Sequence, residues 1–220
     1  MPKAQRTAEE IEAAKIEILE TAVKLIVHVG YDDFSMRKLA KTLGITATTI
    51  YNYYTNKDDL YLHLLIRGFD DLSARLEEVR RQHATAERQL SAMIRAYTDF
   101  GLNQTNFYNL MYSWHVPKYN DYVGTPMQQV ANLQLEAAMK VPAIFFETIR
   151  DYGEERDKAI GETDALFLLI HYWSQLHGFI AGCNNTNIYY LHPDPLSLKN
   201  RHLEFLAAHF MADVSKLTDK

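Results

Sequence analysis

The chain contains few of the residues that form disulfides or turns, namely cysteine, glycine and proline. Its 220 residues include one cysteine, nine glycines and six prolines. The single cysteine, Cys183, excludes an internal disulfide and fits a reducing cytosol. Scarce glycine and proline, and no alternating apolar stretch bounded by turn residues, argue against β-sandwiches and barrels. The sequence therefore predicts an all-α protein.

Long apolar runs are also missing, although 47% hydrophobic residues allow a sizeable core. The most apolar stretch, Leu166 to Ile180, contains two histidines and a glutamine and is too short to span a bilayer. Residues Met1 to Lys15 are charged rather than apolar, so no secretory signal is expected. We therefore expect a cytoplasmic protein with no membrane partner.

Acidic residues are missing from one stretch, although the chain as a whole has a formal net charge of −5. Between Phe34 and Lys57 there is no Asp or Glu. The basic residues of this acid-free stretch are Arg37, Lys38, Lys41 and Lys57. A basic segment on an acidic protein is expected to meet a polyanion, and double-stranded DNA is the leading candidate partner.

The acid-free stretch has the pattern of two short helices separated by a glycine turn. Ser35 and Thr46 are suitable N-caps, and Gly44 permits a sharp turn at positive φ. Gly30 is expected to end the preceding helix in a left-handed conformation. The expected helices are about Ile11–Val29, Ser35–Thr42 and Ala47–Tyr53.

The remainder has the pattern of a helical bundle. Thr55 followed by Asp58 is similar to a capping box and is expected to begin a long helix that carries Leu60 and Val79. Pro142 should kink or interrupt a later helix. Further helices are expected near Ala86–Gln104, Asn106–Trp114, Pro126–Tyr152, Asp164–Ala181 and Pro195–Leu217. The predicted domains are residues 1–57, with the start of the long helix to about 65, and residues 66–220.

A helix with small side chains in its first turn suits the major groove of DNA, because base edges and phosphates can then approach it closely. Arg37 is the best candidate for a bidentate contact to guanine, and Lys57 for a clamp on one phosphate. Further candidate contacts are Thr46, Ala47, Thr48, Thr49, Tyr51 and Tyr53. The alternative is that Tyr51 lies in the core and that Thr46 serves only as a cap.

Several short runs between Ala13 and Leu65 have a characteristic order and spacing. They are Ile18-Leu19, Ala22, Gly30-Tyr31, Phe34-Ser35-Met36-Arg37-Lys38-Leu39-Ala40, Leu43-Gly44-Ile45, Thr49-Ile50-Tyr51-Asn52-Tyr53-Tyr54 and Asn56-Lys57-Asp58-Asp59-Leu60. Together they resemble the DNA-binding domain of TetR-family transcriptional regulators. One departure is Tyr54, which stands where the family most often has phenylalanine.

The resemblance implies a homodimer whose two recognition helices read successive major grooves of a near-palindromic operator. By position it implies phosphate contacts from Ser35, Thr49, Tyr51, Tyr53 and Lys57. It implies base contacts from Arg37, Thr46, Ala47 and Thr48. A ligand-sensing and dimerising helical bundle would follow the DNA-binding domain.

The second part of the chain resembles that family less specifically. The run Trp173-Ser174-Gln175-Leu176-His177-Gly178 is similar to the Trp-x-x-x-His-Gly element of one C-terminal subclass. Ser174, Gly178 and Ala181 form a stripe of small side chains that would let another helix approach closely, from the same chain or from a second subunit. The resemblance favours the second subunit, with the last two helices forming the homodimer interface.

Aromatic residues are dense in the second part and are candidates for a pocket that takes a small, largely apolar effector. The candidates are Tyr97, Phe100, Tyr108, Met111, Trp114, Phe145, Trp173 and His177. The alternative is that they belong to an ordinary core. The histidines at 171, 177, 202 and 209 form no cluster with Cys and carboxylate ligands along their helices, so neither a metal site nor a cofactor is expected.

An enzyme is the main alternative class. The chain has no Glu-x-x-His, no His-Glu-x-x-His, no Gly-x-Ser-x-Gly and no phosphate-binding glycine loop. Cys183 near His177 is weak evidence for a nucleophile, since a buried cysteine at a helix end is usually inert. A helical-bundle enzyme, or a small-molecule-binding protein with a vestigial helix-turn-helix, is the alternative function. The acidic net charge disfavours nonspecific DNA coating.

The expected protein is a ligand-responsive, sequence-specific DNA-binding regulator. Its expected fold is an N-terminal three-helix helix-turn-helix domain joined by a long helix to a C-terminal helical bundle. An effector entering the bundle would move the long helix and release the operator. Repression is favoured, but the choice between repression and activation is left open.

Overall fold

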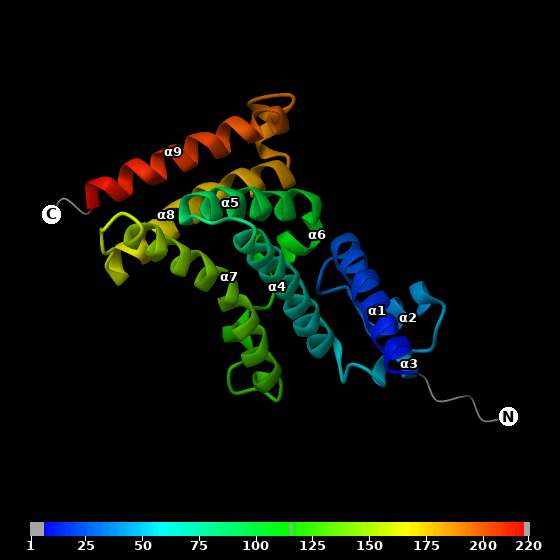
Figure 1. Cartoon of the computed structure of the whole chain (residues 1–220). Coiled ribbons are helices and arrows are strands. Elements are labelled where there is room, and N and C mark those ends of the chain that lie inside the picture. The colour runs from blue at the N-terminus through cyan, green and yellow to red at the C-terminus, as the bar shows by residue number, and fades with distance from the viewer. Residues whose placement is uncertain (1–6, 115, 218–220) are drawn as a thin grey trace. The chain divides into compact units, whose positions relative to one another are not determined.

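The computed structural model describes residues 7–114 and 116–217, and these residues form helices joined by turns (Figure 1). The α-helices are α1 (Ala8–Val29), α2 (Met36–Leu43), α3 (Ala47–Tyr51), α4 (Lys57–Arg81), α5 (Ala86–Asn103), α6 (Thr105–Tyr108), α7 (Gln128–Glu154), α8 (Glu162–Asn184) and α9 (Lys199–Leu217). Shorter turns are the π-helical η1 (Asn109–Ser113) and the 3-10 turns η2 (Tyr119–Tyr122), η3 (Asn187–Tyr190) and η4 (Pro195–Leu198). The all-α prediction is confirmed.

The chain forms two compact units. Of the described residues, the N-terminal unit contains 7–67 together with 116–135, and the bundle contains 68–114 together with 136–217. Helix α4 starts in the N-terminal unit and ends in the bundle, and so does α7. The sequence prediction assigned residues 116–135 to the second domain, whereas in the structure their contacts are with the N-terminal unit.

Local signals explain the helices of the N-terminal unit. Ser35 and Thr46 are N-caps as predicted, and their hydroxyls accept hydrogen bonds from the backbone N–H groups three residues on, at 3.3 Å each. Gly44 has φ 67° and ψ 25°, the left-handed conformation that the turn requires. Gly30 also has positive φ, but its ψ of 160° is extended, so the predicted left-handed helical stop is wrong there. Helix α3 ends at Tyr51, two residues earlier than predicted.

The start of α4 differs from the predicted capping box. Asn56, not Thr55, is the N-cap, and its Oδ1 accepts from the N–H of Asp59 at 2.9 Å. The Asp59 carboxylate in turn accepts from the N–H and the hydroxyl of Thr55 at 2.7 and 2.9 Å. The cap is therefore displaced by one residue, and Asp58 is left for a different contact.

Three predicted helices of the second part have different bounds. The segment expected as Asn106–Trp114 is split into α6 and the π turn η1. Helix α7 begins at Gln128 and continues through Pro142, so the proline does not interrupt it. Helix α9 begins at Lys199, after the separate turn η4, because Asp194 caps Ser197 within that turn at 3.3 Å.

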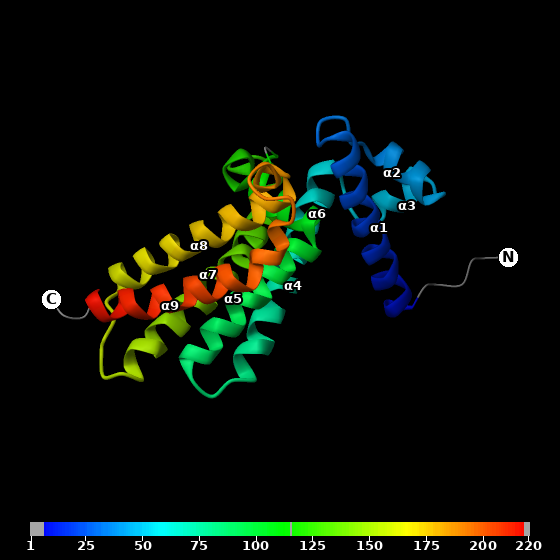
Figure 2. The ribbon, with the colours of Figure 1, turned by 90° about the horizontal axis from the view of Figure 1, so that it is seen from above.

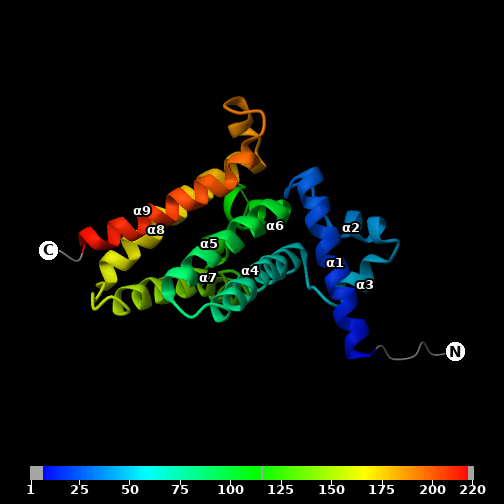
Figure 3. The same ribbon diagram turned by 45° about the horizontal axis from the view of Figure 1, so that its top comes forward.

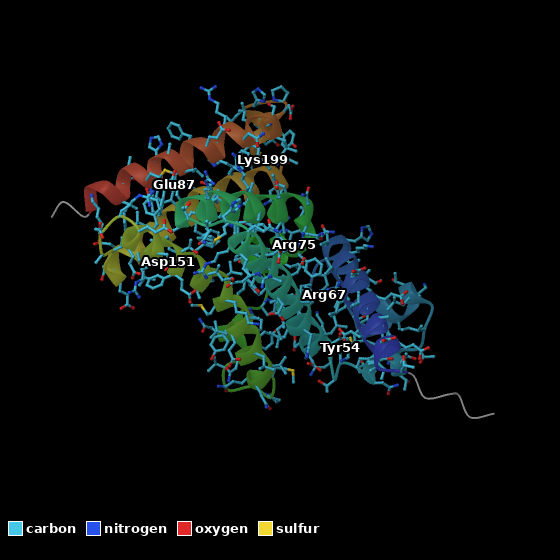
Figure 4. The ribbon with its side chains drawn as sticks, viewed as in Figure 1. Tyr54, Arg67, Arg75, Glu87, Asp151 and Lys199 are labelled. Carbon is cyan, nitrogen blue, oxygen red and sulfur yellow. The ribbon has the colours of Figure 1, made fainter. Side chains whose placement is uncertain are left out.

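The bundle core lies among α5, α8 and α9, which contact one another. Figure 2 and Figure 3 show α8 and α9 side by side. Tyr97, Leu168 and Leu206 are at most 2% exposed there. Ion pairs at the rim join Arg80 to Asp151 and Lys199 to Asp99, at 3.0 and 2.7 Å. Asp151 and Lys199 are labelled in Figure 4. Exposed pairs stabilise by about 0–1 kcal/mol each, so apolar burial holds the bundle together.

No helix of the described residues is both long enough and apolar enough to cross a bilayer.

Replacing Gly44 tests the turn between α2 and α3. An added Cβ would have no neighbour within 4 Å, so the cost of Gly44→Ala is only that of a left-handed backbone. We expect the free energy of unfolding to fall by about 1 kcal/mol. Thermal and urea denaturation followed by circular dichroism measure it. Gly44→Asn is the control and should lose less, since asparagine tolerates this conformation. An Ala variant as stable as the parent would contradict the assignment.

Candidate nucleic-acid interface and effector cavity

The candidate DNA-binding residues lie at the surface of the N-terminal unit. Arg37, Thr46, Thr48 and Tyr51 are exposed. The half-buried candidates are Ser35, Ala47, Thr49, Tyr53 and Lys57. Tyr51 is 50% exposed, which excludes the core alternative for that residue. The inward faces of α2 and α3 are formed by Met36, Leu39, Ala40 and Ile50. Packing therefore turns the predicted contact residues outward.

The basic groups of the acid-free stretch differ in how they are held. The Lys38 ammonium donates to the backbone carbonyl of Asp33 at 2.7 Å. The Lys57 ammonium lies 4.1 Å from the centre of the Tyr31 ring and 3.4 Å from the carbonyl of Asp32. Among the described residues, the exposed guanidinium of Arg37 has no polar or charged partner. It is therefore available for the bidentate geometry that guanine presents in the major groove.

Hydroxyl groups at the start of α3 carry two functions. The Thr46 hydroxyl caps the helix and also lies 3.0 Å from the Thr49 hydroxyl. Both oxygens remain near the surface, where each can also donate to a phosphate. The cap interpretation of Thr46 is therefore correct, and it is compatible with DNA contact.

The tyrosine that departs from the family pattern keeps a packing position. Tyr54 is 3% exposed, and its ring meets the edge of His63 at 5.4 Å (Figure 4). Burial raises the pKa of its phenol, so the group stays neutral. Tyr54 fills the place of a phenylalanine without adding charge to the core.

Two adjoining apolar cavities lie in the bundle. The larger, of about 250 Å³, is lined by Phe69, Tyr112, Ala138, Val141, Pro142, Phe145, Leu169, Ile170 and Trp173. The smaller, of about 40 Å³, is lined by Leu90, Ile94, Tyr97, Phe145, Ile149, Leu168, Leu169, Tyr172, Trp173, Leu176 and Phe210. Phe145, Leu169 and Trp173 line both cavities, and we call these three shared side chains the partition.

The predicted effector residues divide into three groups. Tyr97, Phe145 and Trp173 line the cavities, and Tyr108 and His177 lie directly behind that lining. Phe100 instead borders a polar groove of α4 and α5. Met111 packs against Gly68, and Trp114 follows η1. The sequence did not identify Phe69 or Pro142 as lining residues. For Pro142, its position inside a predicted helix was a signal that could have been used.

A chain of hydrogen bonds runs behind the cavity lining. The Trp173 indole N–H donates to the Tyr97 hydroxyl at 2.8 Å. The Tyr97 and Tyr108 hydroxyls are 3.3 Å apart, and the Tyr108 hydroxyl is 2.9 Å from Nδ1 of His177. The rings of Trp173 and His177 stack with centres 5.0 Å apart. The four-residue spacing thus places both rings on one face of α8.

This hydrogen-bond chain has an electrostatic consequence. Burial lowers the pKa of His177, which favours its neutral imidazole. Burial also raises the pKa values of Tyr97 and Tyr108. The four groups satisfy one another without a net charge, so the cavities they border suit a hydrocarbon rather than an ion.

Two helix irregularities lie at the larger cavity. Tyr112 belongs to the π turn η1, and Pro142 interrupts the hydrogen-bond ladder of α7 because it has no N–H. The carbonyl of Ala138 consequently lacks its helical donor. Such irregularities are costly and are often found at functional sites.

The outer face of α8 is apolar and has no partner helix among the described residues. Leu166, Phe167 and Ile170 are 43%, 56% and 62% exposed. A Cβ placed on Gly178 would meet nothing within 4 Å. Residues 165–193 contain no Asp, Glu, Lys or Arg. A monomer rarely exposes a continuous patch of this kind.

Comparison with protein families gives two matches. The family model for bacterial regulatory proteins of the tetR family matches residues 18–64, and that for the tetracyclin repressor-like C-terminal domain matches residues 90–195. The HTH-type transcriptional activator FasR of Mycolicibacterium smegmatis is 27% identical over 143 residues, covering 65% of this chain and 62% of the relative. The fatty acid metabolism regulator protein of Bacillus subtilis is 33% identical over 79 residues, covering 36% and 41%. The matches thus span less than two thirds of these relatives.

Solved structures share the fold. The fatty acid degradation regulator FadR from Bacillus halodurans aligns with a TM-score of 0.66 at 15% identity, covering 92% of this chain and 96% of that one. FadR from Bacillus subtilis, solved in complex with stearoyl-CoA, gives 0.66 at 20% identity, covering 87% and 97%. The matched family and the relatives named here are regulators, which removes the enzyme alternative. Since the two family models match both parts of the chain, it belongs to the TetR family of bacterial transcriptional regulators.

Proposed function

We propose that the chain is a ligand-responsive regulator that binds a near-palindromic operator as a homodimer and is released by an apolar effector. The observation that carries this proposal is the exposed, acid-free face of α2 and α3 on an acidic chain, with the unpaired guanidinium of Arg37 at its surface. Repression is the favoured sense, because release by a ligand then turns transcription on. The partner is genomic DNA, so the proposed location is the cytoplasm.

The proposed docking divides the contacts by chemistry. Base contacts are assigned to Arg37, Thr46, Ala47 and Thr48, and phosphate contacts to Ser35, Thr49, Tyr51, Tyr53 and Lys57. Each subunit offers few cations here, and phosphate neutralisation supplies much of DNA affinity. Tight binding therefore requires two subunits acting together.

The proposed dimer interface is formed by α8 and α9. Its support is the uncharged outer face of α8, the open space at Gly178 and the 62% exposure of Phe205 on α9. The small-residue stripe at Ser174 and Gly178 would let a partner helix approach closely. An interface of this kind would bury the apolar groups that a single chain leaves in water.

The proposed effector is a long-chain acyl compound. Two relatives are named for fatty acid regulation, and one solved neighbour contains stearoyl-CoA. The larger cavity, about 250 Å³, is below the range of roughly 300–1,000 Å³ typical of ligand sites. A long chain must therefore displace the partition of Phe145, Leu169 and Trp173 to reach the smaller cavity.

Helix α4 is the proposed carrier of the signal. Phe69 on α4 lines the larger cavity, and Lys57 begins the same helix. An effector that moves Phe69 would alter the spacing of the two helix-turn-helix units in a dimer. A coupling free energy of about 1–3 kcal/mol is sufficient for such regulation.

Substitutions at Arg37 and Lys57 separate base reading from phosphate binding. Arg37→Ala should cost about 1–3 kcal/mol on some operators and less on others, whereas Lys57→Ala should weaken all sequences similarly and lower the salt slope by about one. Selection from a random DNA pool supplies the operators, and fluorescence anisotropy at several salt concentrations gives the affinities. Lys24→Ala, an exposed cation of α1, is the control. Unchanged affinity and slope in both variants would refute the docking.

Gly178→Leu tests the dimer. The single chain has room for the new side chain, so its thermal stability as a monomer should be kept. At a packed helix interface the same side chain should cost about 1–3 kcal/mol, which raises the dimer dissociation constant about 5- to 150-fold. Analytical ultracentrifugation measures this constant. Gly161→Leu, at another unobstructed glycine, is the control and should leave it unchanged. A parent chain that is monomeric at micromolar concentration would refute the proposed dimer.

Ala138→Phe tests the effector cavity. The added ring fills space lined by Ala138, whereas Met139→Phe adds a ring at a neighbouring side chain that is 56% exposed. Stearoyl-CoA at 100 times its dissociation constant should stabilise the parent and Met139→Phe by about 2.7 kcal/mol. Ala138→Phe should lose the thermal shift and keep DNA binding. The acyl assignment is wrong if the parent shows no shift with acyl-CoA.

A further inference from the structure

The carboxylate of Asp58 gathers tyrosines from two distant segments of the N-terminal unit. The Tyr31 hydroxyl, from the turn after α1, donates a short hydrogen bond to Oδ1 of Asp58. The Tyr122 hydroxyl, from η2, reaches the same oxygen at 3.5 Å. The two hydroxyls also interact with each other. Segments 64 residues apart therefore meet at the first turn of α4.

Tyr31 connects this cluster to the phosphate-binding candidate Lys57. The Lys57 ammonium lies 4.1 Å from the centre of the Tyr31 ring, a cation–π geometry. The hydroxyl of the same ring is held by Asp58. The Tyr31 ring, together with the Asp32 carbonyl at 3.4 Å, therefore holds the ammonium in place.

Tyr122 is itself firmly held. It is 5% exposed and packs with Leu62 of α4 and Ala131 of α7, both fully buried. Met127, which packs on the same group, accepts a hydrogen bond from the Asn56 amide at 3.6 Å. The segment from η2 to the second turn of α7 is thus docked on the start of α4.

Burial keeps the two phenols of the cluster protonated. Burial raises the pKa of Tyr122 to about 12 and raises that of Tyr31, so both phenols remain donors at neutral pH. Tyr61 supports Tyr31 by an edge contact, with ring centres 4.8 Å apart. No acceptor for the buried Tyr61 hydroxyl is found among the described residues.

We propose that Tyr122 is a positioning residue for Lys57, acting through Asp58 and the Tyr31 ring. This inference rests on the proposed role of Lys57 as a phosphate contact. It makes η2 and the start of α7 part of the DNA-binding apparatus. Helix α7 continues to Pro142 at the larger cavity, so it offers a second continuous connection, beside α4, between that cavity and the start of the DNA-binding apparatus.

Tyr122→Phe tests the inference, because it removes the hydroxyl and keeps the packed ring. Tyr119→Phe is the matched control on the same turn, since its hydroxyl donates to Asn132 at 3.1 Å instead. The first measurement needs no DNA. Lysines are ¹³C-methylated, the Lys57 signal is assigned with Lys57→Arg, and its ring-current shift from Tyr31 is recorded by NMR. Tyr122→Phe should reduce that shift and Tyr119→Phe should preserve it.

The second measurement uses the selected operator. Tyr122→Phe should weaken binding about three- to tenfold, the loss expected for one hydrogen bond. It should also lower the salt slope toward that of Lys57→Ala, which a mere loss of folded protein would not do. In the Lys57→Ala background the same change should alter affinity less than about twofold.

The outcomes separate the two hypotheses. An unchanged Lys57 shift in Tyr122→Phe overturns the positioning role, whatever the DNA results. Fully additive losses with Lys57→Ala also overturn it. If the parent chain selects no DNA sequence, the proposed function fails, and the NMR shift alone decides whether Tyr122 positions Lys57.

Discussion

The burial of the first turns of α4 is the constraint on which the N-terminal unit depends. Leu60, Tyr61, Leu62 and Leu64 are fully buried, so most of this part of the helix is covered, and the side of His63 remains partly exposed. Each such side chain contributes about 1.5–3 kcal/mol relative to exposure. A helix packed in this way cannot rotate without displacing the side chains that contact it. The positions of Lys57 and Asp58 at the N-terminus of α4 are therefore set by the packing of this helix rather than by the loop before it.

The bundle uses a different principle at its cavities. Apolar side chains form the lining, while the polar atoms of Trp173, Tyr97, Tyr108 and His177 are turned toward one another. This arrangement avoids the cost of buried polar groups without partners. It also leaves the cavities without a charged group to orient a ligand. Selectivity must then come from shape and length.

Local hydrogen-bonding rules made much of the N-terminal unit predictable. Ser35, Gly44 and Thr46 act within three or four residues of themselves, so their roles follow from sequence alone. The shift of the α4 cap from Thr55 to Asn56 was not predictable, because two residues in a row can cap and tertiary contacts select between them. The exposed position of Arg37 followed from the buried pattern around it, whereas the core alternative for Tyr51 was excluded only by its 50% exposure in the structure.

Features that depend on distant contacts were not predictable. Nothing near Tyr122 in the sequence indicates that it meets Asp58. Phe69 has the spacing of an ordinary core residue, and only the fold brings it to a cavity. Pro142 was expected to kink or interrupt its helix, and α7 continues through it despite a local penalty of about 3 kcal/mol. A single sequence shows the local preference of each residue, but it does not show whether tertiary packing outweighs that preference.

The partition formed by Phe145, Leu169 and Trp173 has a consequence for which molecules can act as signals. A short apolar compound can occupy the larger cavity and leave the partition in place. Under the proposed function, such a compound binds both states equally and shifts neither if it also leaves Phe69 in place. A molecule long enough to push the partition aside would instead distinguish the two states. The length of the bound acyl chain, rather than its affinity, would then decide whether a compound releases the operator.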